Sequence, residues 1–129
     1  SRRITDMFNA CGNRYQIFCG VDDLLVENVL FGAVGWVCGL VNSFPKEAVR
    51  LFELARDQRV EEAAELYRWF MPLLHLDVDV KLVQMIKLAN QITGEGAEWV
   101  RRPRLTLEGD ERAEVTAIVE AALANRPAL

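Results

Sequence analysis

The chain has 129 residues, of which 51% are hydrophobic and 26% are charged, and its formal net charge is −4. This length and composition suit one folded domain with a buried core and exclude an intrinsically disordered chain. The negative charge and the scattered Lys and Arg residues argue against nucleic acid as a partner.

Three cysteines, at positions 11, 19 and 38, form no CxxC pair. An odd number without that spacing predicts neither a disulfide framework nor a zinc site, and it favours a reducing compartment. We therefore expect a cytoplasmic protein. An uncharged stretch over residues 28–42 is shorter than the roughly 20 residues that a membrane-spanning helix needs, so we expect no membrane contact.

The first part of the chain predicts a helix, then a strand, a helix and a strand. Apolar residues at helical spacing indicate a helix over 3–11, and short apolar runs at 15–19 and 34–38 indicate buried strands. Each run ends in Cys and is followed by Gly. Asp22 and Asp23 suit the first turn of a helix over 22–31. Two strands that are apolar on both faces, with a helix between them, are typical of a parallel βαβ unit.

Only helices are predicted after residue 42. Pro45 opens a helix over 46–56, and a turn over 57–59 leads into a helix over 60–74 with a broad apolar stripe. A third helix follows Asp79 and runs to residue 93, and a last one covers 110–124. Two parallel strands do not make a stable sheet on their own, so the strands indicate the end of a larger sheet.

Several motifs then follow one another in a recognisable order: "CGVDD" at 19–23, "GAVGWVCGLVN" at 32–42, "KLANQITG" at 87–94 and "VRRPRL" at 100–105. Together with Pro45 they resemble the C-terminal part of the dihydrodipicolinate synthase and N-acetylneuraminate lyase superfamily of class I aldolases. The resemblance implies an α/β fold, the C-terminal part of a (β/α)₈ TIM barrel followed by a helical extension. Residues 1–57 would hold the last βα units, and residues 58–129 the extension.

The resemblance also implies a covalent mechanism. Family members form a Schiff base between a lysine and a 2-oxo acid such as pyruvate, and they need no metal or organic cofactor. The matching lysine would lie upstream of Ser1, so we expect no catalytic residue within the chain and no activity from the chain alone. The complete protein is expected to be an aldolase or a dehydratase/deaminase that assembles as a homotetramer.

The strand ends supply the candidate substrate-binding residues. The resemblance places Gly20 and the backbone of Val37 beside the 2-oxo acid and the lysine, with Gly39 at the end of the second strand. Asp22 and Asp23 match acids that accept hydrogen bonds from substrate hydroxyls in the sialic-acid-type members. From residue type alone, two other roles stay open: tight-turn positions for the glycines, and a helix cap for Asp22 with Asp23 in the first turn of that helix.

Other reactive side chains have weaker cases. His75 has no partner at a recognisable spacing, so a loop or interface role is expected rather than that of a base. Lys81 and Lys87 lie on a predicted helix, where solvent contact or packing is the ordinary role. A redox or metal site formed by Cys19 and Cys38 across adjacent strands is the weaker alternative, because buried cysteines usually behave as small apolar residues.

A non-catalytic interaction module is the alternative to a lyase, because residues 45–124 could form a helical unit whose apolar stripes bind a partner. The repeated strand-Cys-Gly units favour the lyase, since a helical adaptor does not require such strands. The substrate stays open between dihydrodipicolinate synthesis and the breakdown of hydroxyproline or sugar acids.

Overall fold

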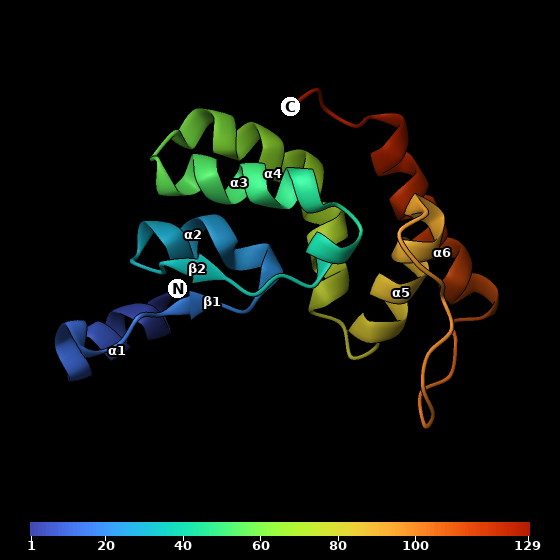
Figure 1. The fold of residues 1–129 in the computed structure, drawn as a ribbon, viewed down its shortest axis with the longest axis horizontal. Coiled ribbons are helices and arrows are strands. Elements are labelled where there is room, and N and C mark those ends of the chain that lie inside the picture. Colours follow the sequence, from blue (N-terminus) through green and yellow to red (C-terminus); the bar gives the residue numbers. More distant parts are fainter.

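The computed structural model describes residues 1–129 as a mainly helical chain with one small parallel sheet (Figure 1). The elements are α1 (Arg2–Cys11), β1 (Phe18–Cys19), α2 (Leu25–Leu30), β2 (Gly35–Trp36), α3 (Pro45–Arg56), α4 (Val60–Leu74), α5 (Leu82–Thr93) and α6 (Gly109–Ala124). Short 3₁₀ helices connect them: η1 (Gly12–Arg14), η2 (Asp22–Leu24), η3 (Leu40–Asn42) and η4 (His75–Asp77). The predicted order of helices and strands is confirmed.

The two strands pair in parallel, as predicted, with Phe18 opposite Gly35 and Cys19 opposite Trp36. Two further backbone hydrogen bonds, each 2.8 Å long, extend the ladder by one residue at either end. The paired segment is shorter than the predicted strands at 15–19 and 34–38, because each strand has a neighbour on one side only.

The two faces of this sheet differ. Cys19 is buried beneath α2, whereas Phe18 and Val37 are exposed, Val37 to 70%. The Phe18 ring covers Gly35 so closely that a Cβ added there would lie 2.3 Å from a ring carbon. A larger residue at position 35 would therefore displace the Phe18 ring, and the face that carries Phe18 and Val37 is open within this chain.

One hydrophobic core runs across the predicted boundary at residues 57 and 58. The ring of Phe44, just before α3, packs edge-on against Trp69 and Phe70 of α4, with centroid distances of 6.0 and 5.9 Å. Figure 1 shows α3 and α4 side by side above the strands. The boundary therefore marks no break in the packing. No helix combines the length and apolar character needed to cross a membrane.

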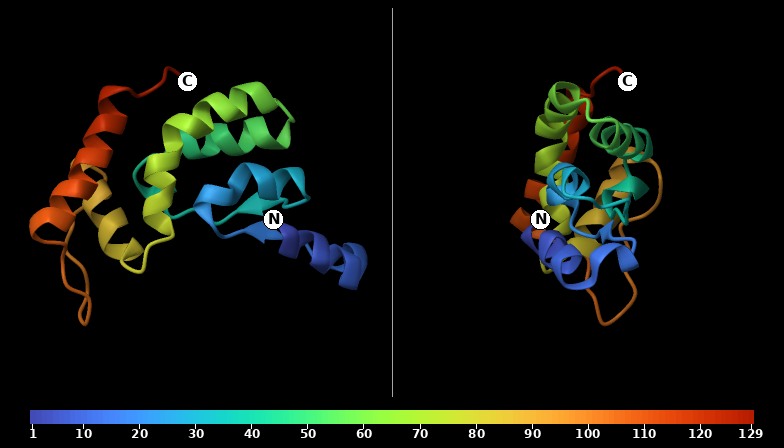
Figure 2. Two further views of the ribbon diagram at one scale, coloured as in Figure 1. Left: turned by 180° about the vertical axis from the view of Figure 1, so that it is seen from behind. Right: turned by 90° about the vertical axis from the view of Figure 1, so that its left-hand side faces the viewer.

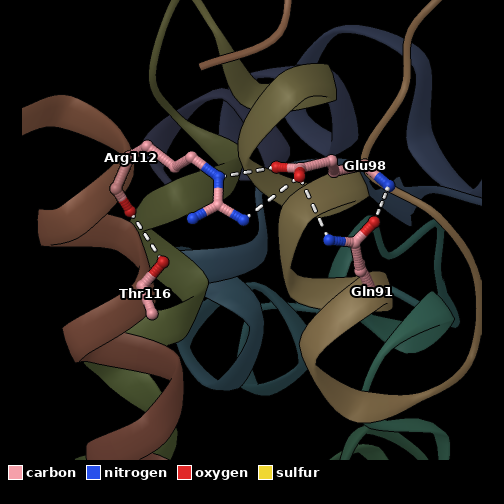
Figure 3. A network of polar contacts seen from close by, with 4 residues as sticks. All are labelled: Gln91, Glu98, Arg112 and Thr116. Atoms are coloured by element: carbon pink, nitrogen blue, oxygen red, sulfur yellow. Dashed lines mark hydrogen bonds and ion pairs between the residues drawn. The ribbon is translucent and has the colours of Figure 1, made fainter. Parts of the chain in front are cut away.

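The loop between α5 and α6 is fixed to both helices by polar side chains (Figure 3). Arg112 of α6 donates to both carboxylate oxygens of Glu98, at 2.8 and 3.1 Å. Gln91 of α5 bonds to the backbone N–H and the carboxylate of Glu98, at 3.1 Å each, and Thr116 donates to the carbonyl of Arg112. Past Glu98 the loop extends away from the helices (Figure 2) before Leu107 returns to the core.

Truncation of Phe70 tests this core. Phe70→Ala leaves a cavity where α3 and α4 meet, and we expect it to lower the free energy of unfolding by about 3–5 kcal/mol in urea denaturation. Val80→Ala is the control, because that side chain is 96% exposed, and its effect should stay within about 0.5 kcal/mol. Equal losses in the two variants would contradict the packing.

Candidate functional site

The carboxylate of Asp22 is fully buried and holds the loop that follows β2. Its Oδ2 accepts the backbone N–H groups of Gly39 and Leu40, at 3.0 Å each, and its Oδ1 accepts the indole N–H of Trp36 at 2.9 Å. The thiol of Cys38 donates to Oδ2 at 3.4 Å. Asp22 thus ties the loop after β1 to the loop after β2, and we call this set of contacts the Asp22 clamp.

The role of Asp22 in the clamp differs from the helix-capping role that its residue type alone left open. Neither η2 nor α2 has a side-chain cap hydrogen bond, so the carboxylate does not cap the helix that follows it. It binds instead the backbone N–H groups at the start of η3, which lies seventeen and eighteen residues further along the chain. A substrate role for Asp22 stays a prediction, and a ligand there would have to compete with protein donors on both oxygens.

The two predicted glycines lie in different surroundings. A Cβ built on Gly39 would lie 2.3 Å from Asp77 Oδ1 and 2.7 Å from Ile86 Cδ1, so a side chain there would displace both. A Cβ built on Gly20 meets nothing within 4 Å. Gly20 and Val37 therefore stand at adjacent strand ends beside open space, whereas Gly39 is enclosed by the protein.

The two strand cysteines do not face each other. Cys19 stands opposite Trp36 in the sheet register, and its sulfur accepts a hydrogen bond from Asn28 Nδ2 at 3.1 Å. Burial, and then the negative charge of Asp22, raise the pKa of the Cys38 thiol well above its ordinary value. A thiol that keeps its proton is a poor nucleophile and a poor metal ligand, so Cys38 serves the clamp.

Asp23 turns towards the segment that follows α4. Nδ1 of His75 lies 3.0 Å from Asp23 Oδ2. The hydroxyl of Tyr67 contacts the backbone carbonyl of Asp23 at 2.5 Å and Glu27 Oε2 at 3.0 Å. The partner of His75 lies 52 residues earlier in the sequence, which is why no local spacing indicates it.

Asp77 lies against the same two loops, next to Gly39. Burial, and then the negative charge of Asp22, raise the pKa of Asp77 to about 6; the charge of Asp23 adds to this, and a contact with the Asp22 backbone opposes it. Sequence reasoning missed this residue. The available signal was the presence of two polar side chains, His75 and Asp77, in the otherwise apolar run over 70–78.

These side chains are not arranged as a metal site, since no three His, Cys, Asp or Glu residues converge on one point. The geometry supplies instead an open pair of strand ends at Gly20 and Val37, bordered by carboxylates. Such a place can accept hydrogen bonds from a polar ligand, and the open backbone can approach it closely.

Replacement of Asp22 should destabilise the fold. In Asp22→Asn the amide NH₂ replaces one acceptor oxygen and faces N–H donors, so at least one buried donor loses its partner. We expect a loss of about 1–3 kcal/mol in the free energy of unfolding, measured by chemical denaturation. Asp23→Asn is the matched control, and it should cost less than about 1 kcal/mol because its histidine partner is exposed. An unchanged stability of Asp22→Asn would refute the clamp.

The raised pKa of Asp77 predicts a pH-dependent stability. The folded state holds this proton up to about pH 6, whereas an unfolded Asp loses it near about 3.9. The free energy of unfolding should therefore fall as pH rises through this window, and then level off. Asp77→Asn removes this titration, so the stability difference between variant and wild type should grow in favour of the variant from about pH 4 to about pH 6. A difference that does not change with pH would contradict the assignment.

The comparisons with known proteins agree with this architecture. The family model described as "Dihydrodipicolinate synthetase family" matches residues 1–122. A DapA-like lyase of Thermococcus kodakarensis, itself uncharacterized, is 29% identical over 101 residues, which cover 78% of this chain and 35% of that protein. A protein of Escherichia coli described as a probable 2-dehydro-3-deoxy-D-pentonate aldolase is 28% identical over 101 residues, or 78% of this chain and 33% of that protein.

Solved structures show the same fold. The dihydrodipicolinate synthase of Oceanobacillus iheyensis superposes with a TM-score of 0.83 at 23% identity, over 95% of this chain and 43% of that one. The synthase of Aquifex aeolicus gives a TM-score of 0.82 at 18% identity, over 93% and 41%. The chain thus spans less than half the length of these relatives. Because the family model matches almost the whole length of this chain, the chain belongs to the dihydrodipicolinate synthetase family.

Proposed function

We propose that the chain is the C-terminal part of a Schiff-base-forming lyase that acts on pyruvate or another 2-oxo acid. Residues 1–57 would supply the last βα units of a (β/α)₈ barrel, and residues 58–129 the helical extension. The observation that carries this proposal is the parallel pairing of β1 and β2 within the matched region. Such a pair needs further strands, and the exposed Phe18 and Val37 give it an apolar face to cover.

The lysine that forms the Schiff base would belong to a part of the complete protein that precedes these residues. The chain has three lysines, and none of them lies at a strand end. Lys46 is in the first turn of α3; Lys81, just before α5, pairs with Glu111 at 2.7 Å; and Lys87 lies 5.2 Å from the centre of the Trp99 ring. In the complete enzyme the lysine amine would condense with the ketone and release water. The protonated imine would then accept the electron pair of the bond that breaks.

The proposed substrate is a hydroxylated 2-oxo acid, and the proposed reaction is aldol cleavage. The similarity to the Escherichia coli protein described as a probable 2-dehydro-3-deoxy-D-pentonate aldolase supports this class. Gly20 and the backbone of Val37 would lie beside the 2-oxo acid, with Gly39 shaping the loop. Asp22 and Asp23 would border the substrate hydroxyls. Of these two carboxylates, that of Asp23 keeps more hydrogen-bonding capacity, because both oxygens of Asp22 already accept hydrogen bonds in the clamp.

The assembly and location follow from the same proposal. We expect a cytoplasmic homotetramer that binds neither nucleic acid nor membranes. The exposed apolar side chains on the open sheet face support burial against further protein, whether the preceding part of the same polypeptide or another subunit.

Chemical trapping tests the proposed chemistry. Borohydride treatment in the presence of pyruvate should give a stoichiometric lysine adduct in the complete protein, located by mass spectrometry on a lysine upstream of this chain. The 129-residue chain alone should give none, because none of its three lysines lies at a strand end, where the 2-oxo acid would bind. An adduct on Lys46, Lys81 or Lys87, or no adduct in the complete protein, would overturn the proposal.

A further inference from the structure

We infer that His75 and Tyr67 are positioning residues, which hold the Asp23 carboxylate at the strand ends so that it can accept a hydroxyl group of the substrate. Both come from residues 58–129, so this part of the chain would help to select the substrate. The inference rests on the proposed function, because it takes Asp23 as one of the residues that border the substrate.

The first support is the way the carboxylate is held. The side chain of Asp23 is only 17% exposed, whereas that of His75 is 58% exposed. The imidazole Nδ1 lies 3.0 Å from Oδ2, and Oδ1 receives no hydrogen bond within this chain. One oxygen is therefore fixed by the protein while the other keeps its capacity to accept. A carboxylate held on one side in this way is oriented towards a donor on the other side.

The second support is that the backbone of Asp23 is held as well. The Tyr67 hydroxyl contacts the Asp23 carbonyl and the Glu27 carboxylate, so its single proton is shared between two acceptors. Burial, and then the charge of Glu27, raise the pKa of Tyr67 far above its ordinary value. The hydroxyl therefore remains a donor throughout the working pH range. Side chain and main chain of Asp23 are thus both restrained, from α4 and from η4.

The third support is the contrast with the neighbouring acid. Asp22 accepts hydrogen bonds from four donors, which belong to β2 and the segment that follows it, and is fully buried. The side chain of Asp23 has one hydrogen-bonding partner in the chain, His75 of the extension. The two adjacent carboxylates therefore have different roles. Asp22 fixes the loop, whereas Asp23 lies at the surface of that loop.

The experiment uses the complete enzyme and two substrates of one class. Cleavage of a 2-oxo-3-deoxy acid with hydroxyl groups beyond C4 is compared with cleavage of a 4-hydroxy-2-oxo acid that lacks them, by following pyruvate release. His75→Ala should raise KM for the first substrate about tenfold, the size of one lost hydrogen bond. The value of kcat should stay within about twofold, since uniform binding is lost and not transition-state stabilisation. KM for the second substrate should not change.

Two further variants separate positioning from folding. His75→Asn places an amide nitrogen close to where Nδ1 stands, so it should restore most of the KM, and Tyr67→Phe should raise KM for the first substrate only. Arg59→Ala is the matched control, because it removes an exposed ion pair with Glu62 at the start of α4 and should change neither KM. The melting temperatures of His75→Ala and the control should agree with that of the wild type.

The outcomes distinguish this inference from the proposed function. If pyruvate and borohydride give no adduct in the complete enzyme, the proposed function fails and the inference fails with it. If the adduct forms but His75→Ala leaves both KM values unchanged, the inference alone is wrong. Equal changes for both substrates, or a lowered melting temperature, would assign His75 and Tyr67 a purely structural role and would also overturn it.

Discussion

The two strand-end loops depend on one constraint, which is that the carboxylate of Asp22 is buried away from solvent. An ionised acid can be buried only if donors surround it, and Asp22 finds them in Trp36, Gly39 and Leu40. Two of these donors are main-chain N–H groups at the start of a short 3₁₀ helix, where no other backbone partner is available to them. The same contacts therefore satisfy the acid and the loop, and they fix the distance between the ends of β1 and β2.

The C-terminal helices belong to the same structural unit as the strands. Phe44 and Phe70 join the core across the boundary predicted at residues 57 and 58, and Glu47 of α3 pairs with Arg126 after α6. Near the strand ends, α4 and η4 bring Tyr67, His75 and Asp77 against the loops. The helices after residue 58 thus contribute side chains to the neighbourhood of the candidate site, in addition to covering apolar surface.

Much of the fold could be predicted because its signals are local. The helix over 60–74 was predicted with the bounds that the structure has, from apolar spacing alone, and Gly94 ends α5 in the left-handed conformation that glycine favours. Strand lengths were overestimated, since the number of neighbouring strands is not encoded in a five-residue run. The partners of Asp22 and His75 lie 14 to 52 residues away, and only the folded chain brings them together. For this reason the sequence names candidate residues at the strand ends but not the different surroundings of the two acids.

The close approach of Asp77 to Gly39 links two positions that are far apart in the sequence. A side chain at position 39 would occupy the space of the Asp77 carboxylate and of the Ile86 methyl group. A larger residue at position 39 therefore requires that these two side chains turn away, or that position 77 holds a smaller residue. The segment after α4 thus limits the space open to the residues that follow the second strand.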